Sequence, residues 1–167
     1  MSVQGQRRWN GSENWAAYAA ATWAFAFSAM SFYWAMGGMA ASRTLAHSIQ
    51  EKADRGETSF VALLWATGCL KLLAGLLALA LAPRWKTAIH RKLLLLAGWA
   101  AGGFMAIYGL AGTTQALLME LDLTDIPESF GADVVRWYLF FWEPFWLLGG
   151  ILFILATWQK RKALASP

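Results

Sequence analysis

The chain has 167 residues, the size of one domain, and 58% of its residues are hydrophobic, 11 of them tryptophan. A soluble domain of this length could not bury so much apolar surface, which excludes an ordinary water-soluble globular protein. We attribute the net charge of +4 to membrane topology, and we expect no nucleic-acid partner.

The apolar residues are gathered into four blocks. The blocks are residues 15–41, 60–82, 93–119 and 137–158. Two contain no charged side chain and the other two contain one each, Lys71 and Glu143. Each reaches the roughly 20 residues that cross about 30 Å of hydrocarbon as a helix. The sequence therefore predicts one all-α membrane domain, residues 1–167, folded as a bundle of four transmembrane helices in a lipid bilayer.

The first block could instead be a secretory signal, because Arg7 and Arg8 precede it and small residues follow it. A signal core has only about 7–15 apolar residues, however, and this block is longer. Ser12, followed by Glu13, is a typical N-cap. We therefore interpret the block as a retained span.

Basic residues are distributed unequally between the two sides of the predicted membrane domain. One side has Arg7, Arg8, Arg84, Lys86, Arg91, Lys92, Lys160, Arg161 and Lys162. The other side has Arg43, Lys52, Arg55 and Arg136. Because cytoplasmic segments are enriched in lysine and arginine, both termini are predicted to be cytoplasmic.

The connecting segments differ in length and charge. The short cytoplasmic turn at residues 83–92 makes the second and third spans antiparallel neighbours. The outer segment 42–59 mixes charges and is expected to hold a short helix, and the outer segment 120–137 is acidic. The acidic segment is either a functional lid or an ordinary solvated loop.

The sequence predicts no metal site and no cofactor. Cys69 is the single cysteine and lies inside the second span, so no intramolecular disulfide can form. His47 and His90 fall on opposite sides of the membrane and cannot share a metal ion.

A tryptophan followed three residues later by glycine recurs in every block. The glycines of this pattern are Gly37, Gly38, Gly68, Gly102, Gly103, Gly149 and Gly150. Spacing of three residues places the indole and the first glycine on one helical face, where glycine lets a neighbouring backbone approach. We interpret the pattern as a packing device in preference to a ligand site. Span 1 adds a strip of small residues, namely Ala20, Ala24, Ser28, Ser31 and Ala35.

Lys71 lies near the middle of the second span, too deep for its side chain to reach water. An unpaired charge there costs at least about 2.5–3.5 kcal/mol. Glu143, in the parallel fourth span, is predicted to be its partner, with Arg136 as a rival partner for Glu143. The pair is either a structural staple or part of a ligand site.

Pro144 follows Glu143 and is predicted to kink the fourth span or to start a new helix there. Irregular backbone within a membrane faces protein or a water-filled cavity. Other side chains expected near this level are Tyr33, Trp34, Tyr108 and Trp142.

Two short boxes carry a resemblance. "FYWAMGG" in the first block and "WEPFWLLGG" in the fourth resemble those of an uncharacterised family of small bacterial four-helix membrane proteins. The resemblance implies a four-helix fold in the bacterial inner membrane and transfers no catalytic residue.

Three classes of function stay open. The favoured one is binding or transport of a small amphipathic or charged ligand at the Lys71–Glu143 site, in a homo-oligomer. The second is an accessory or assembly subunit that docks a membrane protein partner. The third is an enzyme acting on a lipid or isoprenoid, but the sequence has no paired carboxylates, metal-ligand cluster, activated nucleophile or phosphate loop.

Overall fold

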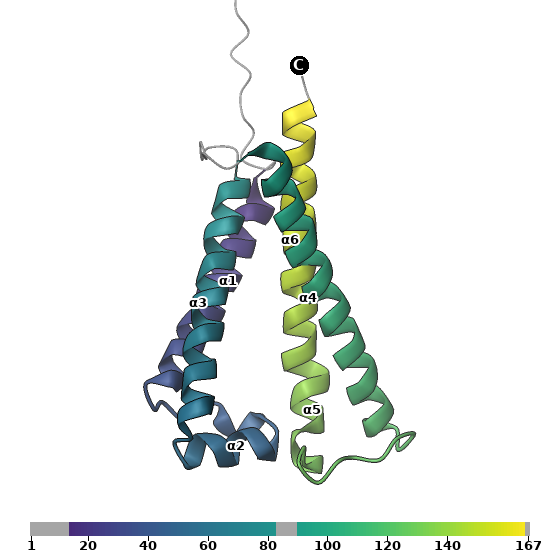
Figure 1. The fold of residues 1–167 in the computed structure, drawn as a ribbon. Coiled ribbons are helices and arrows are strands. Elements are labelled where there is room, and N and C mark those ends of the chain that lie inside the picture. The colour runs from purple at the N-terminus through teal and green to yellow at the C-terminus, as the bar shows by residue number, and fades with distance from the viewer. Residues whose placement is uncertain (1–13, 83–89, 166–167) are drawn as a thin grey trace, which may run out of the picture.

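The structure, a computed structural model, describes residues 14–82 and 90–165, and every regular element in these two stretches is helical (Figure 1). Three of their segments are long and apolar enough to cross a membrane. They are Thr58–Leu81, Arg91–Glu120 and Ala132–Ala165. The expected N-cap Ser12 and the basic residues at positions 7, 8, 84 and 86 lie outside the described residues.

Helix α1, Trp15–Ala35, ends six residues before the predicted boundary at residue 41. The amides of Gly37 and Gly38 donate to the carbonyls of Trp34 and Tyr33 at 3.0 and 2.9 Å, which closes the helix as a Schellman motif. Gly37 has φ +89°, a conformation that glycine adopts without steric cost. The prediction that Gly37 and Gly38 pack against another helix is therefore wrong, because they terminate this one.

The strip of small residues on α1 is buried, as predicted. Ala20 and Ala24 are 0% exposed, and Ser28 and Ser31 are 2% and 1% exposed. The Ser28 hydroxyl donates to the Gly68 carbonyl on the neighbouring helix at 2.8 Å. Small side chains on this face let α1 approach that helix closely.

The middle of the chain forms three helices in the predicted order. The short helix α2, His47–Asp54, lies in the first outer segment. Helix α3, Thr58–Leu81, and helix α4, Arg91–Glu120, begin two residues before the predicted spans and end within one residue of them. The apolar blocks set these boundaries to within two residues, and each helix adds one or two polar residues at one end or both, such as Thr58 and Ser59 of α3 and Arg91 and Lys92 of α4.

The last span is irregular near Pro144, as predicted. A 3-10 turn η3, Ala132–Val134, leads into α5, Val135–Trp137, then into the π-helical turn η4, Tyr138–Trp142, and finally into α6, Glu143–Ala165. The Glu143 amide donates to the Tyr138 carbonyl five residues earlier. Because Pro144 has no N–H, the regular α-pattern cannot continue through it, and the wider π turn accommodates the break.

The four long helices form two antiparallel pairs, α1 with α3 and α4 with α6 (Figure 1). The pairs converge where α3 ends and α4 begins, and they diverge toward the end that carries α2 and α5. Aromatic side chains of α1 and α6 fill the space between the pairs, with Trp23 6%, Phe27 4% and Phe153 0% exposed.

Glycines determine how closely α4 and α6 approach. Gly102 faces the backbone of Gly150 and Ile154, and Gly150 faces the backbone of Ala106. Gly149 lies against the Trp23 indole, and the α3 glycine Gly68 lies against the Phe32 ring. All four glycines therefore lie at close contacts between helices or between a helix and an aromatic ring.

Gly103 is different. A Cβ atom at Gly103 would meet nothing within 4 Å. It therefore points away from the bundle, and the predicted packing role is wrong for this position.

The segments 42–59 and 120–137 join the helix pairs at the divergent end. The amides of His47 and Ser48 donate to the carbonyls of Phe130 and Ser129 at 3.1 and 2.9 Å. The His47 imidazole also lies 2.8 Å from the Asp133 carboxylate. These contacts hold α2 and the loop before η3 together across the open end.

Candidate functional site

Lys71 lies thirteen residues after the start of α3 and ten before its end. At a rise of 1.5 Å per residue these distances are about 20 and 15 Å along the helix axis. Gly68, Gly75 and Ala78 on the same face are buried against α1 and its neighbours. The lysine side chain therefore enters the bundle interior near the middle of the helix.

The ammonium group of Lys71 has one hydrogen bond and two aromatic contacts. Its Nζ donates to the Ser31 hydroxyl at 2.8 Å. It also lies 3.6 Å from the centroid of the Phe27 ring and 5.7 Å from that of Trp146. Aromatic faces stabilise a desolvated cation by about 2 kcal/mol, but they do not neutralise its charge.

A cavity of about 440 Å³ adjoins the lysine. Its walls come from α1, α3, α4 and α6. They are Trp23, Thr67, Leu70, Lys71, Leu73, Ala74, Leu77, Ala101, Phe104, Met105 and Trp146. Apart from Lys71 and Thr67 the walls are apolar, a lining typical of sites for amphipathic small molecules.

Glu143 lies elsewhere, and no Lys71–Glu143 ion pair forms within the described stretches. The Glu143 side chain is 6% exposed and packs on Gly112 of α4. Glu143 shares one face of α6 with Leu147 and Gly150, which pack on Gly109 and Ala106 of α4, so the carboxyl group faces α4 instead of α3. The predicted contact between Lys71 and Glu143 is therefore wrong. Lys71 lies against Ser31 of α1, whereas Glu143 lies against Gly112 of α4.

Arg136 is not near the lysine either. Its Nε donates to the Glu120 carboxylate at 2.8 Å, at the C-terminal end of α4. Arg136 therefore pairs with Glu120 and not with Glu143. Exposed ion pairs of this kind contribute at most about 1 kcal/mol to the free energy of unfolding.

Two of the remaining predicted residues belong to the α1 terminus. The Trp34 indole donates to the Ala40 carbonyl at 2.8 Å, and the Tyr33 hydroxyl accepts from the Ala40 amide at 3.4 Å. Tyr33 also covers Gly38. Both side chains stabilise the turn after α1 and do not line the cavity.

The other two lie on α4 and on the π turn. Trp142 is buried and donates from its indole to the Thr44 carbonyl and hydroxyl, both at 3.1 Å. Tyr108 packs edge-to-face on Trp146 at 5.3 Å between ring centroids. Tyr108 therefore borders the cavity wall through Trp146, whereas Trp142 anchors the outer segment.

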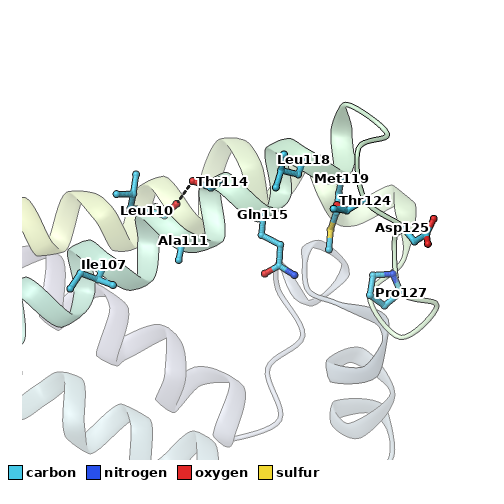
Figure 2. Close-up of a pocket in the computed structure, with 10 residues that line it drawn as sticks. All are labelled: Ile107, Leu110, Ala111, Thr114, Gln115, Leu118, Met119, Thr124, Asp125 and Pro127. Carbon is cyan, nitrogen blue, oxygen red and sulfur yellow. Dashed lines mark hydrogen bonds between the residues drawn. The ribbon is translucent and has the colours of Figure 1, made fainter.

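A larger hollow of about 650 Å³ lies on the C-terminal half of α4 (Figure 2). Its lining residues are Ile107, Leu110, Ala111, Thr114, Gln115, Leu118, Met119, Thr124, Asp125 and Pro127. They come from one helix and the loop after it. The Thr114 hydroxyl donates to the Leu110 carbonyl at 2.8 Å and so already has a partner within the helix. We prefer the cavity at Lys71 as the site, because four helices converge there on a charged group.

A family described as "Protein of unknown function (DUF3995)" matches residues 24–153, more than three quarters of the chain. The chain belongs to this family. The matched region contains both sequence boxes, at residues 32–38 and 142–150, and Lys71. No curated protein and no solved structure matches the chain.

Sequence reasoning missed the groups that contact Lys71 in this DUF3995 member. Ser31 was recognised only as a small residue and Trp146 only as a packing residue. The signal in the sequence was the Ser31 hydroxyl, which stands on a strip of α1 that is otherwise mostly alanine. Within the described residues, no group of three His, Cys, Asp or Glu side chains converges on a point.

Proposed function

We propose that this protein is a four-span protein of the bacterial cytoplasmic membrane that binds, and in that way transports, an amphipathic ligand with an anionic head group. The head group sits on the Lys71 ammonium and the apolar part occupies the cavity between α3 and α4. The observation that carries this proposal is a cation deep in an apolar cavity with no carboxylate beside it in the described residues.

The packing of α1 against α3 supports α1 as a fourth membrane span. Helix α1 is less aliphatic than the three candidate spans, since it contains three tryptophans, two tyrosines and two serines. It nevertheless runs beside α3 and contacts it along its length (Figure 1). A membrane crossed by α3 therefore surrounds α1 as well. Its 21 residues would extend about 32 Å, enough for the hydrocarbon core.

A cytoplasmic location of both termini is supported by charge. The start of α1, the end of α3, the start of α4 and the end of α6 lie at the convergent end (Figure 1). Arg91, Lys92, Arg161 and Lys162 are at this end. Basic residues favour the cytoplasmic side.

An anionic head group is supported by the coordination of Lys71. An ammonium has three N–H donors, and Lys71 directs one of them to the Ser31 hydroxyl. A charge that lacks a counterion inside a membrane costs at least about 2.5–3.5 kcal/mol. A carboxylate or phosphate oxygen brought by a ligand would accept the remaining donors and remove that cost.

An apolar tail is supported by the position of the cavity mouth. Leu70, Leu73 and Phe104 line the cavity and are each more than 60% exposed on the outside of the bundle. The opening is therefore directed sideways toward the hydrocarbon, and a ligand could enter from the bilayer with its chain between α3 and α4.

Quenching of tryptophan fluorescence by a brominated fatty acid tests this proposal, because Trp23 and Trp146 line the cavity. The protein in phosphatidylcholine nanodiscs is titrated with dibromostearate and, separately, with its uncharged methyl ester. We expect the acid to quench at lower concentration than the ester. Lys71→Met should weaken binding of the acid about ten- to a hundredfold, the equivalent of one charged hydrogen bond, and leave the ester unchanged.

Lys160→Met is the matched control. Lys160 is buried, but it donates to the Ala82 carbonyl at 3.3 Å at the convergent end, away from the cavity. A second variant, Ala74→Phe, fills the cavity and should abolish saturable quenching without removing the charge. The proposal is refuted if acid and ester quench the wild-type protein equally, or if Lys71→Met retains the difference between them.

A further inference from the structure

Glu143 is a buried acid whose carboxyl group has no counterion in the described chain. It is 6% exposed, and its Oε2 atom has no hydrogen-bond partner. Buried polar atoms in proteins nearly always have partners, so an exception calls for a physical explanation. A carboxylate in this position would carry an unsatisfied charge in the apolar space between α4 and α6.

Among residues 14–82 and 90–165, the groups around this carboxyl supply no positive charge. From α4, Gly112 packs directly against it and Tyr108 lies one turn away along the helix. From the π turn on its own span, Tyr138 is the nearest ionisable group along the chain, and its hydroxyl accepts from the Ala46 amide at 3.3 Å. The two cations once expected near Glu143 are engaged elsewhere, Lys71 with Ser31 and Arg136 with Glu120.

The cradle at Gly112 is shaped for the carboxyl group. A Cβ atom at this position would overlap the carboxyl carbon and both oxygens of Glu143. Only a residue without a side chain leaves this space free. The acid is thus held in the helix–helix contact and does not extend toward water.

We propose that Glu143 is a proton-binding site of the membrane interior, occupied by a proton while α4 and α6 are packed together. A protonated carboxylic acid has no net charge, so it avoids the several kcal/mol that an isolated buried carboxylate costs. The proposal rests on the geometry at Gly112 and does not require the ligand at Lys71.

Proton occupancy of Glu143 also sets the charge near the cavity. Glu143 precedes Trp146 by three residues, which places both on one side of α6. Trp146 forms the wall between this region and Lys71. When Glu143 is protonated it carries no negative charge, so the positive charge of Lys71 is not compensated and the cavity stays positive.

A hydrophobic carbodiimide tests the proposal, because it reacts with protonated carboxyl groups in apolar surroundings. The acid proton moves to a carbodiimide nitrogen and the carboxyl oxygen adds to the central carbon. The adduct then rearranges to a stable N-acylurea, so one whole reagent is added and nothing leaves. We treat the protein in nanodiscs at neutral pH with dicyclohexylcarbodiimide and locate the added mass by peptide mapping.

We expect one added reagent at Glu143, loss of labelling as the pH rises, and no labelling of Glu143→Gln. Glu120, which lies in an ion pair at the helix end, is the internal control and should remain unlabelled. Gly112→Ala displaces only the flexible end of Glu143, so the fold should persist while labelling falls. An unlabelled Glu143 in the folded protein, or equal labelling of Glu120, overturns the proposal.

Discussion

Replacing Gly109 by alanine should force α4 and α6 apart. A Cβ atom at Gly109 would lie 2.8 Å from the Glu143 carbonyl oxygen and closer still to the Leu147 amide nitrogen. Both atoms belong to the α6 backbone, which cannot rotate away as a side chain can. Ordinary contact begins at 3.4 Å, so α6 would have to move by at least roughly 0.6 Å, a shift that packed interiors resist.

The matched control is Gly103→Ala. Both glycines lie inside α4, but a Cβ atom at Gly103 would meet nothing within 4 Å. Each substitution gains about 1 kcal/mol from the better helix propensity of alanine. Because that gain is common to both, the difference between the two variants isolates the packing cost, for which we expect about 1–3 kcal/mol.

Thermal unfolding in detergent, followed by the helical signal in circular dichroism, measures this difference. For a chain of this size 1 kcal/mol shifts the midpoint by about 2–4 °C. Gly109→Ala should therefore melt roughly 2–12 °C below Gly103→Ala. Equal midpoints would refute the close backbone packing of α4 on α6.

Two further predictions concern single hydrogen bonds. Trp142→Phe keeps the ring but loses the bonds to Thr44, so the free energy of unfolding should fall by about 1 kcal/mol. The half-exposed Trp137→Phe should change it far less in the same melt, and equal losses would contradict the anchoring role of Trp142. Ser31→Ala removes the hydroxyl that accepts from Lys71, with an expected cost of about 1.5–3 kcal/mol. In a Lys71→Met background that cost should largely disappear, and a double-mutant cycle showing no coupling would count against the contact.

Much of the fold could be predicted from residue type along the chain. The boundaries of α3 and α4 follow from where apolar residues give way to polar ones. The irregular turn before α6 follows from Pro144, which has no amide hydrogen. The end of α1 was predicted too late, because the glycines at 37 and 38 were interpreted as packing residues and not as a helix terminator.

The site was harder to predict, because it depends on how each helix is turned about its own axis. Hydropathy identified Lys71 and Glu143 as the two charges within apolar blocks, and their depths suggested a pair. The depth of a residue along a helix axis does not determine the direction in which its side chain points around that axis. The partners of Lys71 on α1 became apparent only when α1 and α3 were seen packed through their small residues.

The sequence by itself determined that the chain is helical and apolar enough for a membrane, where three of its long helices lie, and that a lysine and a glutamate interrupt its apolar blocks. Only the tertiary structure decided that these two charges do not meet. The physical reason is the helical phase of α6, in which residues three or four apart lie on one face. Glu143 shares with Leu147 and Gly150 the face that packs on α4, which directs it to Gly112, while Lys71 is left with Ser31, two aromatic rings and an apolar cavity.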